Sequence, residues 1–147
     1  MSQPQLPSRQ PHRRLLALDP GERRIGVAVS DELGMFAHPR PAIAAGGRAI
    51  DFIAGLVESE AVTEVIVGLP LSLSGAESNQ TRSARQFASS LRARLPVPVT
   101  EWDERLSSVE AGRNVHGSGR RSGELDSAAA SVVLQAVLDF RSRGARP

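Results

Sequence analysis

The sequence predicts a single α/β domain built on a five-stranded mixed sheet with helices on both faces. Three observations support this fold class. Three short apolar runs precede any helical pattern, strand-helix crossovers follow them, and the last long segment carries the apolar stripe of a helix. With 147 residues, the chain is long enough for one compact domain with a sizeable core and too short for two ordinary ones.

The first three strands are expected to be antiparallel. The apolar runs "LLALD" (15–19) and "IGVAVS" (25–30) are separated by the turn sequence "PGERR", which predicts a hairpin. The segment "MFAHPRPAI" (35–43) follows after another short connection. Its prolines favour a position at the edge of the sheet, because proline cannot donate a hydrogen bond to a neighbouring strand.

A crossover pattern begins after residue 47. Apolar residues recur at helical spacing from Ile50 to Val57, and "TEVIVGL" (63–69) then reads as a strand that is buried on both faces. A second helical stripe (84–95) and a short strand (97–102) repeat the arrangement. A third helix is expected to begin at Ser107, and the final helix has an apolar stripe over 129–140. Such crossovers make the later strands parallel to the first.

The composition limits the class of protein. Residues 1–13 are expected to form a disordered tail, residues 14–141 a single domain, and residues 142–147 a flexible C-terminal tail. The absence of cysteine excludes disulfides and thiolate metal sites. No apolar run approaches the roughly 18 residues of a membrane span, and no signal-peptide core is visible. We therefore expect a cytoplasmic protein with no membrane partner.

Acidic residues follow the strands that are predicted to be parallel. Asp19 ends the first strand, Asp103 and Glu104 follow the last strand, and Asp126 opens the final helix, three residues before Ala129 on its apolar stripe. Ligand sites in such sheets lie at the carboxyl ends of the parallel strands, so these carboxylates are expected to converge. Converging acids repel one another unless a cation lies between them, and a hard divalent ion such as Mg²⁺ fits oxygen ligands.

Each acid also has a purely structural interpretation. Asp-Pro-Gly is a common turn signal, which would make Asp19 a turn residue. Asp126 is a suitable helix N-cap, and Asp103 or Glu104 would form an ordinary surface ion pair with Arg105.

All 18 basic residues are arginine, and the net charge is only +2. Guanidinium groups bind phosphates in a forked geometry, so local clusters matter more than the total charge. The candidate substrate-binding residues lie near the acids or in a glycine-rich loop, and they are Arg23, Arg24, Arg105, Arg120 and Arg121. Aromatic residues make up only 3% of the chain, so side chains on which a nucleobase could stack are scarce, and a nucleic-acid ligand would be recognised mostly by its backbone and shape.

Four segments together resemble the YqgF/RuvX family of RNase H-like nucleases. They are, in order, "ALDPGERRIGVAVSD", "VIVGLPLSLSG", "WDERLSS" and "LDSAAASVVLQAVLDF", and the resemblance extends from Leu15 to Phe140. It implies a five-stranded RNase H-like fold that binds Mg²⁺ or Mn²⁺, with two ions expected. It also implies hydrolysis of phosphodiester bonds in the 5′-end processing of pre-16S rRNA. Some members are instead described as Holliday junction resolvases that act on branched DNA.

Carried over by position, the resemblance implies that the catalytic, metal-holding acids are Asp19, the acid of "DER" and Asp126. In "DER" we favour Asp103, because strand alternation places it on one face with Val99 and Glu101, and we keep Glu104 as the alternative. One ion would be held by Asp19 and the "DER" acid, and the other by Asp19 and Asp126. The implied partners are pre-16S rRNA or branched DNA, together with the assembling small ribosomal subunit.

Two other functions remain open from the sequence. An acid followed by glycine and an apolar hairpin also begins actin-like ATP-binding domains, although these generally need two such domains to enclose ATP. A non-catalytic, ribosome-associated binding module is the other alternative. Retention of the acids argues against a degenerate site.

Overall fold

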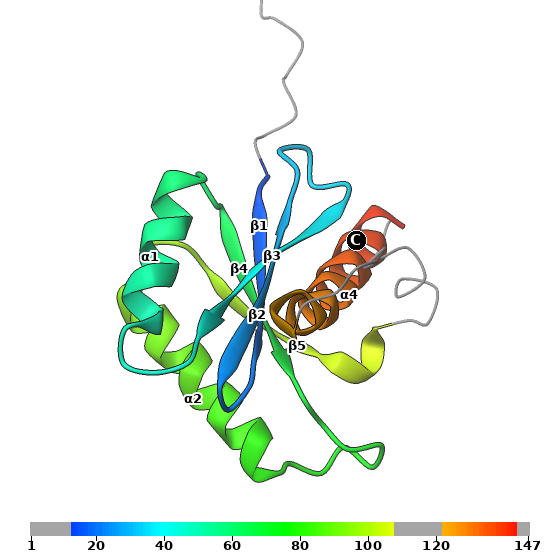
Figure 1. Cartoon of the computed structure of the whole chain (residues 1–147). Helices are drawn as coiled ribbons and strands as arrows, with labels where there is room; N and C mark the ends of the chain where they lie inside the picture. The colour runs from blue at the N-terminus through cyan, green and yellow to red at the C-terminus, as the bar shows by residue number, and fades with distance from the viewer. Residues whose placement is uncertain (1–12, 108–121, 144–147) are drawn as a thin grey trace, which may run out of the picture.

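The computed structural model describes residues 13–107 and 122–143, with the backbone alone for residues 122–126 (Figure 1). The third helix expected from Ser107 falls mainly on residues outside this description. In chain order the elements are β1 (Leu15–Pro20), β2 (Arg24–Ser30), β3 (Ala37–Ala44), α1 (Ala49–Ser59), β4 (Glu64–Leu69), α2 (Asn79–Arg94), β5 (Val99–Asp103), the short 3₁₀ helix η1 (Glu104–Leu106) and α4 (Ser122–Ser142). None of the helices in the described part of the chain has both the length and the apolar character needed to cross a membrane.

The five strands form one sheet in the order β3-β2-β1-β4-β5. β1 pairs antiparallel with β2, and β2 with β3, whereas β4 lies parallel to both β1 and β5. The predicted mixed sheet is therefore confirmed, including the edge position of the proline-containing strand β3. The carboxyl ends of the three parallel strands, at Pro20, Leu69 and Asp103, all lie at one edge of the sheet.

The sheet separates two apolar cores (Figure 1). In β1, Leu16 and Leu18 pack toward α1 and α2, whereas Leu15 and Ala17 pack toward α4. All four of these side chains are almost fully buried, and burial of each leucine is worth about 1.5–3 kcal/mol. Because side chains alternate along a strand, Asp19 shares its face with Ala17. The acid that ends β1 therefore belongs to the face covered by α4.

Helix α4 is anchored to the sheet through an irregularity in β2. The pairing of β2 with β3 shifts register between Ile25 and Val27, and such a bulge disrupts the regular ladder of hydrogen bonds. Here the backbone N–H of Val27 donates to the hydroxyl of Ser127 at 3.1 Å. Farther along α4, the amide oxygen of Gln135 accepts a hydrogen bond from the N–H of Ala37 at 2.9 Å. These polar contacts fix α4 against β2 and β3.

A capping box fixes the start of α2 at the end of β4. The hydroxyl of Ser78 accepts from the N–H of Thr81 at 3.2 Å, and the Thr81 hydroxyl accepts from the N–H of Ser78 at 3.1 Å. The buried Thr81 hydroxyl also donates to the carbonyl of Pro70, one residue after β4. The first turns of α2 are thereby held beside the carboxyl edge of the sheet.

At the opposite edge, Glu64 links three elements. Its carboxylate accepts hydrogen bonds from Arg141 of α4 at 2.7 and 2.9 Å and from the Thr100 hydroxyl of β5 at 2.7 Å. The Arg141 guanidinium lowers the pKa of Glu64 below its ordinary value of 4.5, outweighing burial, which raises it. Only 19% of the Glu64 side chain is exposed, so solvent screens this pair less than an open surface pair.

Arg141→Gln should lower the free energy of unfolding by about 1 kcal/mol at neutral pH. Since the folded-state pKa of Glu64 is depressed, this stabilisation is fully present above the unfolded value and is lost as pH falls through the folded value. Urea denaturation at pH 7 and pH 3 measures the effect. Arg94→Gln is the control, because Arg94 forms an ion pair with the highly exposed Asp51, at 3.5 Å. A difference between wild type and Arg141→Gln that does not depend on pH would contradict this account.

Candidate active site

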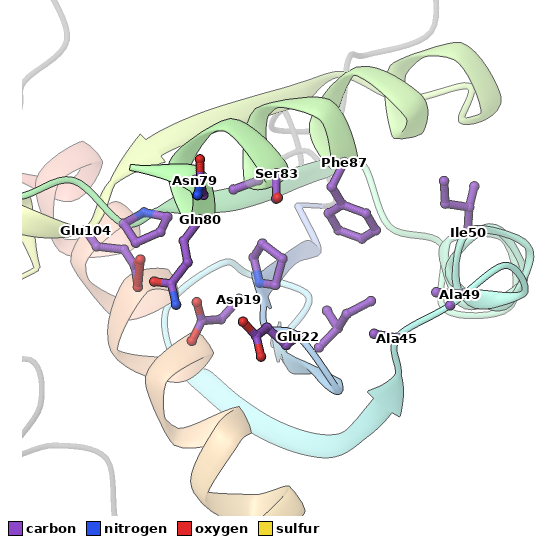
Figure 2. Close-up of a pocket in the computed structure, with 16 residues that line it drawn as sticks. Asp19, Glu22, Ala45, Ala49, Ile50, Asn79, Gln80, Ser83, Phe87 and Glu104 are labelled. Atoms are coloured by element: carbon purple, nitrogen blue, oxygen red, sulfur yellow. The ribbon is translucent and has the colours of Figure 1, made fainter. Parts of the chain in front are cut away.

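A cavity of about 590 Å³ opens at the carboxyl edge of the sheet (Figure 2). Its walls come from the end of β1 and the turn that follows it, from the start of α1, from the first half of α2 and from η1. Three acidic residues, Asp19, Glu22 and Glu104, lie together at one end (Figure 2). The cavity is therefore where the sequence predicts a ligand site, at the ends of the parallel strands.

Asp19 and Glu104 form a carboxyl pair. Both side chains are half-buried, and they are joined by a side-chain hydrogen bond. Burial raises the pKa of Glu104 and the charge of Asp103 raises it further, while the hydrogen bond to Asp19 acts in the opposite direction. The net shift is upward, so the fully ionised pair is disfavoured when no cation is bound.

Gly68 of β4 leaves room for the Glu104 side chain of this pair. β1 and β5 are not neighbours, since β4 lies between them, and Gly68 is the β4 residue that pairs with Trp102 of β5. A Cβ atom at position 68 would lie 3.3 Å from Cγ of Glu104 and 3.5 Å from a methyl group of Val133 in α4. The Glu104 side chain therefore lies directly over the glycine, between the sheet and α4.

Asp103 lies on the other face of the sheet. It alternates with Val99 and Glu101 as the sequence predicts, but Val99 packs into the core on the α1 and α2 side, opposite the face to which Asp19 belongs. Asp103 does not line the cavity. The structure thus brings Asp19 together with the alternative acid of "DER", Glu104, and not with Asp103.

Asp103 instead holds Arg105. Its carboxylate accepts from Nε and Nη2 of Arg105 at 3.0 and 2.6 Å and from the Arg105 backbone N–H at 2.9 Å. Hydrogen bonding by Arg105 lowers the pKa of Asp103. The guanidinium also donates to the carbonyl of Leu73 at 3.3 Å, which ties η1 to the loop between β4 and α2. In this arrangement Arg105 positions a loop rather than facing the cavity.

The remaining predicted residues lie beside the cavity or outside the described part of the chain. Arg23, in the turn after β1, and Arg24, the first residue of β2, are both exposed, and a 3.0 Å hydrogen bond from Gly21 N–H to the Arg24 carbonyl closes this turn. They flank the cavity without lining it. Arg120 and Arg121 belong to the residues that the structure does not describe.

Asp126 belongs to α4 and immediately precedes Ser127. The structure describes its backbone but not its side chain. Because Ser127 contacts Val27, and the neighbouring Gly26 pairs with Asp19, this turn of α4 crosses the sheet near the end of β1. Among the side chains that are described, no three acids or histidines form a metal-holding group.

Comparison with known proteins identifies the family. The family model described as "RuvX: Holliday junction resolvase" matches residues 13–140. The chain belongs to the RuvX family. A relative from Koribacter versatilis, named "Putative pre-16S rRNA nuclease", is 43% identical over 136 residues, covering 88% of this chain and 89% of the relative. A relative of the same name from Thermobifida fusca is 46% identical over 144 residues, covering 90% and 91% of the two chains.

Solved structures support the fold of this RuvX protein. RuvC from Thermus thermophilus, in complex with a Holliday junction substrate, superposes with a TM-score of 0.62 at 14% identity, covering 90% of this chain and 97% of RuvC. A second Thermus thermophilus RuvC structure gives a TM-score of 0.63 at 13% identity, covering 89% and 96%. The predicted RNase H-like fold is confirmed by this likeness and by the strand order.

The RuvX cavity includes three residues that the sequence does not single out for function. Glu22 follows Asp19 in the hairpin turn, while Gln80 and Phe87 come from α2. Proximity to Asp19 is a signal for Glu22. No local pattern identifies Gln80, and Phe87 reads simply as part of the apolar stripe of its helix.

Gly68→Ala should displace the Glu104 side chain by a few tenths of an ångström or more and lengthen its contact with Asp19, because the new methyl group would press on Glu104 Cγ. Gly55→Ala, in α1, is the matched control, since a Cβ there meets no atom within 4 Å. Crystal structures of the two variants provide the measurement. A Glu104 carboxyl group that keeps its position in Gly68→Ala would show that the glycine is not what allows the pair to form.

Proposed function

We propose that this RuvX protein is a divalent-metal-dependent nuclease that hydrolyses phosphodiester bonds in the 5′-end processing of pre-16S rRNA. The observation that carries the chemistry is the Asp19–Glu104 carboxyl pair, which lies over Gly68 at the carboxyl edge of the sheet. The names of the relatives from Koribacter and Thermobifida support the choice of RNA substrate.

The carboxyl pair is suited to a hard divalent cation. Two carboxyl groups that hydrogen bond to each other share a proton, and burial of Glu104 penalises the doubly charged state. A divalent ion would neutralise both charges in place of that proton. The available donors are carboxylate oxygens, which Mg²⁺ and Mn²⁺ prefer. We assign Asp19, Glu104 and Asp126 as the metal-holding catalytic acids, with Glu104 in preference to Asp103.

Different residues of the site have different roles in the proposed reaction. Bound divalent ions supply the activation of water and the stabilisation of the departing 3′ oxygen that phosphodiester hydrolysis needs. Asp19 contributes from the rigid end of β1, and Glu104 is held in place by its contact with Gly68. Arg105, fixed by Asp103, keeps the loop after β4 in position. Arg23 and Arg24 are exposed beside the cavity and attract the phosphate backbone, so binding is expected to weaken with salt.

Holliday junction resolution is the second candidate, and the description of the family model favours it. A four-way junction requires two symmetry-related cuts, so a resolvase is expected to act as a dimer with paired sites. Processing of a single rRNA end has no such requirement. The family assignment favours either nuclease over an actin-like ATP-binding domain or a non-catalytic module.

Asp19→Asn and Glu104→Gln should each reduce Mg²⁺- or Mn²⁺-dependent cleavage of a pre-16S 5′-end RNA by more than about 100-fold, because each removes a charged metal-holding oxygen. Asp103→Asn is the matched control. It should stay within about fivefold of wild type, because Asp103 does not line the cavity and the amide oxygen of asparagine can still accept hydrogen bonds from Arg105. Cleavage is measured on RNA and on a four-way DNA junction in parallel. An equal loss in Asp103→Asn and Glu104→Gln would contradict the assignment of Glu104.

The same variants decide the physiological role in cells that lack the protein. Mapping of 5′ ends should reveal extended pre-16S rRNA, restored to mature ends by wild type and by Asp103→Asn but not by Asp19→Asn. Equal rescue by Asp19→Asn would remove the enzymatic role. Cleavage of the junction alone, with normal 16S ends in the deletion strain, would favour the resolvase.

A further inference from the structure

The cavity continues well beyond the acids. From Asp19 and Glu104 it passes over the edge of the sheet toward the layer formed by α1 and α2, where its wall becomes apolar. Ile50 of α1 and Phe87 of α2 face each other across this far end (Figure 2). The cavity thus has one acidic end and one apolar end, on opposite sides of the sheet edge.

Only part of the Phe87 side chain packs against the apolar core. It is half-buried and packs against the core cluster on the α1 and α2 side, while its ring also lines the cavity. The face of this ring that meets the cavity is available to a flat apolar group.

Polar groups on the same helix lie between the two ends. Gln80, Ser83 and Phe87 follow helical spacing and line one wall, and Gln80 is about 10 Å from Phe87 along the helix axis at 1.5 Å per residue. The Gln80 side chain extends toward Asp19 (Figure 2). Gln80 offers both donors and an acceptor, and Ser83 offers a hydroxyl, so this wall is suited to the polar edge of a neutral ring.

We propose that this cavity binds an unpaired nucleobase of the substrate strand, at a nucleotide adjacent to the scissile phosphate. The phosphate lies at the acidic end, the base stacks on Phe87, and Gln80 and Ser83 hydrogen bond to its edge. The location of the phosphate rests on the proposed function. The volume of about 590 Å³ is within the range of small-molecule sites and leaves room for a base and its sugar.

This arrangement restricts the substrate. The base must leave any duplex to reach Phe87, because the apolar end lies between residues of α1 and α2. Single strands and frayed ends are therefore preferred over continuous duplex. The proposal adds a base contact to the recognition by backbone and shape that the sequence predicts, and one aromatic residue at the cavity suffices for it.

The test uses the full-length protein with Ca²⁺ and short single-stranded oligonucleotides, each carrying one 2-aminopurine at a different position. Stacking on Phe87 should quench the fluorescence of the base at one position. Phe87→Leu retains apolar volume but removes the aromatic face, and Phe87→Ala removes both. Each should lose the quench and weaken binding by about 10-fold, the scale of one base-aromatic stack. Phe52→Leu is the matched control, because Phe52 is 60% exposed on α1 and does not line the cavity.

The outcomes separate this proposal from the proposed function. Quenching that depends on Phe87, without any Mg²⁺- or Mn²⁺-dependent cleavage, would support the base site and refute the nuclease. Metal-dependent cleavage with unchanged binding and quenching in Phe87→Leu would overturn the base site and leave the nuclease intact. RNA and DNA arms distinguish the type of strand. Equal binding of an oligonucleotide that is abasic at the quenched position would also overturn the base site.

Discussion

The contact between the Asp19 and Glu104 carboxyl groups across Gly68 is the constraint on which the rest of the site depends. The two acids come from opposite sides of β4, and a Cβ atom on β4 at this point would press on the Glu104 side chain. The glycine lets Glu104 lie between the sheet and α4, where burial disfavours its charge. The close approach of these two acids thus follows from the strand order and from the absence of a side chain at position 68.

The supporting layers make this contact stable. At the bulge in β2, the N–H of Val27 donates a hydrogen bond to the Ser127 hydroxyl. This bond fixes α4 over the face of the sheet that carries Asp19. On the other face, the capping box of α2 holds the cavity wall. The ion pair of Asp103 with Arg105 holds the loop after β4. The candidate functional residues come from strand ends and turns, and hydrogen bonds in the surrounding elements hold them in place.

Much of this could be predicted from the sequence, because the periodicity of apolar residues specifies strands and helices directly. The mixed sheet, the edge position of β3 and the placement of Asp19 at a strand end all follow from local patterns. The choice within "DER" shows the limit. The alternation of side chains along β5 correctly placed Asp103 on the same face of the sheet as Val99. Whether Asp19 lies on that face too depends on how the residues of β1 and β5 are aligned across β4. This register cannot be read from a local sequence pattern.

Other features depend on tertiary structure alone. Nothing in the segment around Gly68 indicates that Glu104 packs against it, and nothing in α2 distinguishes Phe87 from its buried neighbours Ala84 and Ala88. The role of Arg105 also changes once its partners are known. The sequence leaves open a phosphate-binding Arg105 and an ion pair of Arg105 with Asp103 or Glu104. In the fold, Arg105 binds the Asp103 carboxylate and the Leu73 carbonyl.

The central claim is that these two carboxyl groups share a divalent cation. Crystals of the protein soaked in Mn²⁺, with anomalous diffraction collected at the manganese absorption edge, test it most directly. The account predicts an anomalous peak that contacts carboxylate oxygens of both Asp19 and Glu104 and disappears in Glu104→Gln. A peak on Asp103 instead, or no peak near Asp19 at saturating Mn²⁺, would contradict it.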